Sequence, residues 1–221
     1  MTLIDVPTEQ TTAATDVVLA LVAIMASVLT CRAGKVTNPK KGKIWAWAFG
    51  LLAFAAMTGA VAHGFQMSTR LNYILWQPLN LALGLTVSMF VVGVVYDLTR
   101  GSLPNVVLPV MIATGSAFYL ITLLFPGTFL VFILYEAVAM IFALVVYILL
   151  GIRNRVRGAW LMALGIFITI IAAAIQASEA IHFTCIWEFD HNGIFHIVQI
   201  AGVFILYFGL RKELKDKGRV T

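Results

Sequence analysis

Residues 128–151 read TFLVFILYEAVAMIFALVVYILLG, and this stretch decides the fold because Glu136 is its only charged residue. A helix needs about 20 predominantly apolar residues to cross a bilayer. Six further runs of this kind fill most of the chain, which is 61% hydrophobic and 11% charged, whereas soluble domains carry about 25% charged residues. The sequence therefore predicts an all-α, seven-helix transmembrane bundle that forms one domain over residues 1–221, with spans at about 13–31, 44–65, 71–97, 104–126, 128–151, 158–180 and 193–211.

The basic residues lie almost entirely on one side of the predicted bundle. Lysines and arginines follow spans 1, 3, 5 and 7, whereas the other side has only Arg70. Because short loops rich in Lys and Arg stay cytoplasmic, we expect the N-terminus outside and the C-terminus in the cytoplasm. The net charge of +5 is then explained by topology and by contacts with anionic membrane lipid, so we expect no nucleic-acid partner. The compact chain is typical of a multi-pass protein of a bacterial inner (plasma) membrane.

Most polar side chains within the spans fall in their outer halves, and all four histidines lie on that side. Polar groups inside a membrane usually face the interior of the bundle. We therefore expect one outer-half cavity lined by spans 1, 2, 3, 5, 6 and 7. The residues predicted to line it are Asp16, Asn72, Gln77, Asn80, Gln176, His182, Asn192 and Gln199.

Two aspartates have simpler interpretations. Asp16 follows TTAAT near the outer surface, and a capping role at the start of the first span is favoured for it. Asp97 lies close enough to Arg100 and the inner interface that we expect water to solvate it.

Residues 189–199, FDHNGIFHIVQ, contain two histidines where the last span begins. Asp190 or Asn192 can cap a helix, which predicts a helix start here with His191 in the loop over the cavity. Asn192 and His196 are four residues apart and His196 and Gln199 three, so these side chains are expected to share one inward face. Gln176, Glu179 and His182 are spaced by three at the end of the sixth span.

The histidine that ends the second span and the pair that opens the last resemble the membrane hydrolase superfamily of alkaline ceramidases and progestin/adiponectin-type receptors. In that family three histidines hold zinc, a serine precedes the first by one turn, and an aspartate lies on span 3. The resemblance implies that His63, His191 and His196 hold zinc. The chain departs from the pattern because the pair reads HNGIFH, Gly59 replaces the serine, and span 3 has no aspartate at that depth. The segment DHNGIFHIVQ also resembles a motif of an uncharacterised bacterial seven-helix family.

Several functions stay open. The first is a zinc-dependent hydrolase that cleaves an amide or ester bond of a lipid or small-molecule substrate at the outer side of the membrane, with Glu136, Glu179 or Asp190 handling protons. The alternative is a non-enzymatic sensor, receptor or transporter that binds a small polar ligand or a proton in the same cavity. Interhelical hydrogen bonding is the structural explanation of the same histidines. A retinal protein is excluded because the last span has no lysine before Arg211.

Overall fold

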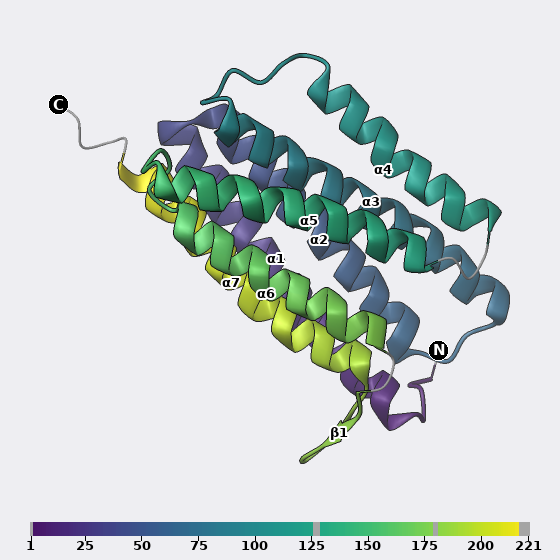
Figure 1. The fold of residues 1–221 in the computed structure, drawn as a ribbon. Coiled ribbons are helices and arrows are strands. Elements are labelled where there is room, and N and C mark those ends of the chain that lie inside the picture. The colour runs from purple at the N-terminus through teal and green to yellow at the C-terminus, as the bar shows by residue number, and fades with distance from the viewer. Residues whose placement is uncertain (1, 126–128, 179–180, 217–221) are drawn as a thin grey trace.

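The computed structural model describes residues 2–125, 129–178 and 181–216, and its helices form one bundle (Figure 1). Each of the seven described helices is long and apolar enough to cross a membrane, which confirms the predicted all-α class with seven candidate spans. A short antiparallel hairpin, which was not expected, precedes the last helix. The elements are α1 (Pro7–Thr37), α2 (Pro39–Gly64), α3 (Thr69–Leu98), α4 (Val107–Leu124), α5 (Phe129–Ile152), α6 (Ala159–Ser178), β1 (Phe183–Thr184), β2 (Glu188–Phe189) and α7 (His191–Asp216).

Six of the helices close a ring in the order α1, α2, α3, α5, α6, α7, with α7 packed back against α1. α4 stands outside this ring, against α3 and α5 (Figure 1). Gly115 is the only buried residue of α4, and it meets Gly84 of α3 so closely that a Cβ on Gly84 would lie 2.6 Å from the carbonyl oxygen of Gly115. Small residues at such a crossing let the two backbones approach.

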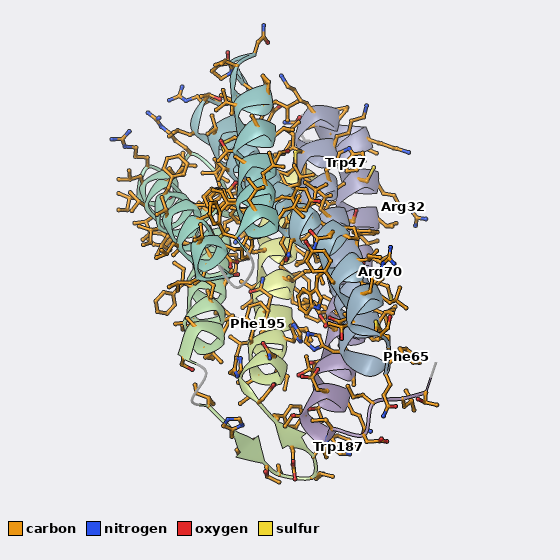
Figure 2. The ribbon with its side chains drawn as sticks, turned by 90° about the vertical axis from the view of Figure 1, so that its right-hand side faces the viewer. Arg32, Trp47, Phe65, Arg70, Trp187 and Phe195 are labelled. Atoms are coloured by element: carbon orange, nitrogen blue, oxygen red, sulfur yellow. The ribbon has the colours of Figure 1, made fainter. Side chains whose placement is uncertain are left out.

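The two ends of the bundle differ in composition. Helices α1, α3, α5 and α7 begin at one end of the bundle, which we call the hairpin end. The opposite end carries most of the lysines and arginines, and we call it the basic end. Figure 2 shows Trp187 at the hairpin end and Arg32 and Trp47 toward the basic end. The largest apolar core is centred on Trp45, which is fully buried with its ring edge-on to that of Phe90 at 4.9 Å.

A buried ionic cluster lies at the basic end. Lys41 Nζ of α2 lies 2.7 Å from Asp97 Oδ1 of α3 and also contacts the Glu213 carboxylate of α7. The Tyr147 hydroxyl of α5 donates to Asp97 Oδ2 at 2.7 Å. Lys41 and Asp97 are only 1% and 6% exposed, so the expectation that water solvates Asp97 is wrong. Lys41 and Tyr147, from two other helices, contact this carboxylate instead.

Candidate functional site

A cavity of about 600 Å³ lies inside the six-helix ring. This volume falls within the range of about 300–1,000 Å³ that is usual for small-molecule sites. Apolar side chains of the core form much of its wall, including Phe49, Phe90 and Leu206. Polar side chains from all six ring helices also reach it, namely Asp16, His63, Asn80, Glu136, Gln176, His191, Asn192, His196 and Gln199. The external helix α4 contributes Thr122 alone.

Some of the predicted wall residues lie elsewhere. The amide of Asn72 donates to the carbonyl oxygen of Ala62 at 3.3 Å, and that of Gln77 donates to the carbonyl oxygen of Tyr73 at 3.1 Å. Neither side chain belongs to the described cavity wall. His182 is exposed, follows the described end of α6 at Ser178, and does not belong to the described cavity wall. The expectation that Asn72, Gln77 and His182 line the cavity is therefore wrong. Glu179 lies outside the described residues.

An aspartate–histidine pair joins α1 to α7 beside the cavity. Asp16 Oδ1 lies 3.2 Å from Nε2 of His196, and the two residues are 4% and 8% exposed. Nδ1 of His196 lies 3.1 Å from the Thr15 hydroxyl. That hydroxyl already donates to a backbone carbonyl of α1, so Nδ1–H donates to it. The preferred capping role of Asp16 is therefore wrong, because α1 begins two turns earlier, at Pro7.

Gly59 of α2 makes room for this pair. A Cβ at residue 59 would lie 2.6 Å from Asp16 Oδ2, closer than side-chain carbons approach such an atom. Gly59 also lies one turn before His63, where the family resemblance places a serine. In this chain the position provides space for a carboxylate from another helix.

His63 is held by a residue that sequence reasoning missed. Its Nδ1 lies 2.6 Å from Oε2 of Glu9, and its ring stands edge-on to Trp76 at 5.5 Å. Glu9 precedes Asp16 by seven residues, so both lie on nearly the same face of α1. That spacing was the available signal, but Glu9 falls before the apolar run by which the first span was recognised.

Asp190 caps the start of α7, as the sequence predicts. Its Oδ1 accepts from the Gly193 backbone N–H at 2.9 Å and from the Thr12 hydroxyl at 3.1 Å, while Asn192 donates to Oδ2 at 3.2 Å. Burial disfavours the charge, but these hydrogen bonds outweigh it and hold the pKa of Asp190 below its usual value. Asp190 lies outside the described cavity wall, and His191 is the first residue of α7 rather than part of the loop.

Several polar groups of the cavity wall lack a partner in the described part of the chain. Buried atoms without a hydrogen bond include Gln176 Oε1, Gln199 Oε1 and His191 Nδ1. Glu136 has neither a hydrogen bond nor an ion pair with any described residue. Leaving a buried polar group unpaired costs about 1–3 kcal/mol, so these groups need an explanation beyond packing.

The arrangement does not fit the zinc site that the family resemblance implies. Among the described residues, no three His, Cys, Asp or Glu side chains are grouped so that they could hold one metal ion. Both ring nitrogens of His196 have protein partners at hydrogen-bonding distance. A zinc ligand must instead direct a free lone pair at an ion about 2.0–2.1 Å away.

No curated protein and no solved structure matches this chain. A family model described as a family of unknown function, DUF6962, matches residues 11–215, from the first turns of α1 to the last turn of α7. This match includes every described residue of the cavity wall. Because the match spans nearly the whole chain, the protein belongs to the DUF6962 family.

Proposed function

We propose that this protein is a non-enzymatic membrane receptor or sensor that binds a small amphipathic molecule in the cavity of its six-helix ring. The observation that carries the proposal is the set of unpaired polar atoms in a wall that is otherwise largely apolar. A ligand with a polar head and an apolar body would pair those atoms and cover that wall. Sites for small molecules typically combine apolar walls with a few such polar groups.

The zinc-dependent hydrolase stays a prediction that ranks below ligand binding. Asp16, His196 and Thr15 form the arrangement most similar to one that activates a nucleophile for hydrolysis. Their three side chains already bond to one another. Measuring the zinc content of the purified protein tests this ranking, and about one tightly held zinc ion per chain would reverse it.

We also propose that the hairpin end faces the non-cytoplasmic side of a bacterial inner membrane. The support is the distribution of charge, because Lys and Arg dominate the loops of the basic end and loops of this kind remain in the cytoplasm. A ligand would then reach the cavity from the outer side of the membrane.

Ligand binding is tested by filling the cavity. Ala173 of α6 is 7% exposed and lines the cavity, whereas its neighbour Ala174 is exposed on the outside of the bundle. We would measure the Tm of the purified protein with 2-phenylethanol, 2-phenylethylamine and 3-phenylpropionate, which share an apolar body and differ in the head group. A compound that binds the folded state raises the Tm.

The expected result is stabilisation of the wild type and of Ala174→Phe by at least one compound, and loss of this effect in Ala173→Phe. Equal stabilisation of all three proteins would place binding outside the cavity. No stabilisation of the wild type by any of the compounds would count against the proposed function.

A further inference from the structure

The charge balance of the cavity wall indicates which head group the ligand carries. Among the described residues, the wall contains two carboxylates, Asp16 and Glu136, and no lysine or arginine. Asp16 is paired with His196, so Glu136 is the acid that has no partner among the described residues. An anionic ligand would meet this carboxylate without a lysine or arginine of the described wall to compensate it.

Glu136 lies within an apolar stripe of α5. Phe132 and Met140 are four residues before and after it, so the three side chains share one face, and all three line the cavity. A carboxylate among such neighbours loses the solvation that stabilises its charge in water. A cation placed beside it restores that stabilisation, and the surrounding aromatic rings also attract cations.

The amide of Gln176 adds a second acceptor, and a chain of hydrogen bonds determines its orientation. The ionised carboxylate of Asp190 can only accept, so Asn192 presents its Nδ2 to it and leaves Oδ1 to accept from Gln176 Nε2 at 2.7 Å. The Oε1 of Gln176 is therefore the atom left buried and unpaired. Gln199, 7% exposed and with its own Oε1 unpaired, supplies a further amide in the same wall.

We infer that the ligand carries a protonated amine, which binds Glu136 as its counter-ion and donates to the Gln176 amide oxygen, with the apolar part of the ligand against the cavity wall. This inference rests on the proposed function and specifies the chemical class of its ligand. An alcohol could satisfy an acceptor but would bring no positive charge to the carboxyl group of Glu136. A carboxylic acid would add a second anion.

The same three phenylethyl compounds test the inference. We expect 2-phenylethylamine to bind wild-type protein at least about tenfold more tightly than 2-phenylethanol, because hydrogen bonds to charged groups are the stronger ones, and 3-phenylpropionate to bind most weakly. Glu136→Gln should reduce the affinity for the amine to about that for the alcohol. Glu136→Asp should keep part of the preference.

Glu188→Gln is the matched control, because it removes an exposed carboxylate on the hairpin and should leave all affinities unchanged. Equal affinity for amine and alcohol in the wild type, or an amine preference that survives Glu136→Gln, would overturn the amine inference. In both cases, loss of binding in Ala173→Phe would still support the cavity as the binding site. Failure of all three compounds to bind would count against the inference and the proposed function together.

Discussion

The absence of a side chain at Gly59 allows the pair between Asp16 and His196 to form. Asp16 lies on α1 and His196 on α7, and the carboxylate between them also presses against α2 at Gly59. Any larger residue at position 59 would occupy the space of Oδ2. The contact between three helices beside the cavity thus depends on a residue that itself makes no polar contact.

Replacing this glycine should therefore destabilise the protein. We expect Gly59→Ala to lower the free energy of unfolding by about 1–3 kcal/mol, as overpacking of a filled site does, and to lower the Tm by several degrees. Gly50→Ala on the same helix is the control, because its new Cβ would meet Ser27 Oγ at an ordinary 3.5 Å. In an Asp16→Ala background the cost of Gly59→Ala should vanish. A cost that persists there would show that the carboxylate is not the obstacle.

Which single residues enter the cavity could be predicted partly from their depth in the spans. Asp16, His63, Glu136 and His196 were expected near the outer side, and all four line the cavity. Their partners could not be derived in this way. A hydrogen bond such as that between His63 and Glu9 depends on how two helices rotate about their axes, and the apolar pattern does not record that rotation.

Among the elements, the start of α7 was predictable and the position of α4 was not. Asp190 caps α7 through atoms only three residues away, so the local sequence suffices. α4 is as apolar as the ring helices but only Gly115 is buried. In a membrane both lipid and protein neighbours are apolar, so hydrophobicity does not distinguish a ring helix from an external one.

The ionic cluster at the basic end joins four helices, and Lys41 is its only cation among the described residues. Lys41→Met should cost about 3–5 kcal/mol, because the buried Asp97 carboxylate would remain beside the half-buried Glu213 without a counter-charge. Lys43→Met, at an exposed position on the same helix, should change stability little. Chemical denaturation in detergent measures both effects.

A rescue variant separates charge from packing in this cluster. Adding Asp97→Asn and Glu213→Gln to Lys41→Met removes every formal charge of the cluster and should recover much of the lost stability. If Lys41→Met alone were as stable as the wild type, the cluster would not hold these helices together.

At the scale of the whole molecule, the alternating direction of successive helices was enough to predict the shared cavity. Successive helices cross in opposite directions, so polar groups at the starts of α1, α5 and α7 and at the ends of α2 and α6 gather at one end. The chemistry performed there could not be predicted in the same way. It depends on which lone pairs stay free, and His196 uses both of its ring nitrogens within the protein.

The proposed orientation is tested by labelling cysteine from one side of the membrane. Cys185 is a free and exposed thiol on the hairpin, and Cys31→Ser leaves it as the only cysteine of the chain. A membrane-impermeant maleimide should label this variant in intact cells. A cysteine-free chain carrying Ser102→Cys, at an exposed loop position of the basic end, should react only after permeabilisation. The reverse pattern would invert the topology.

The most direct test of ligand binding is an experimental density map of the protein with a saturating amount of the phenylethyl compound that raises its Tm most. We predict that density for the compound lies inside the six-helix ring, with its polar head toward Glu136 and Gln176 and its phenyl ring against the apolar wall. Density only on the lipid-facing surface, or side chains that fill the cavity, would contradict the proposed function.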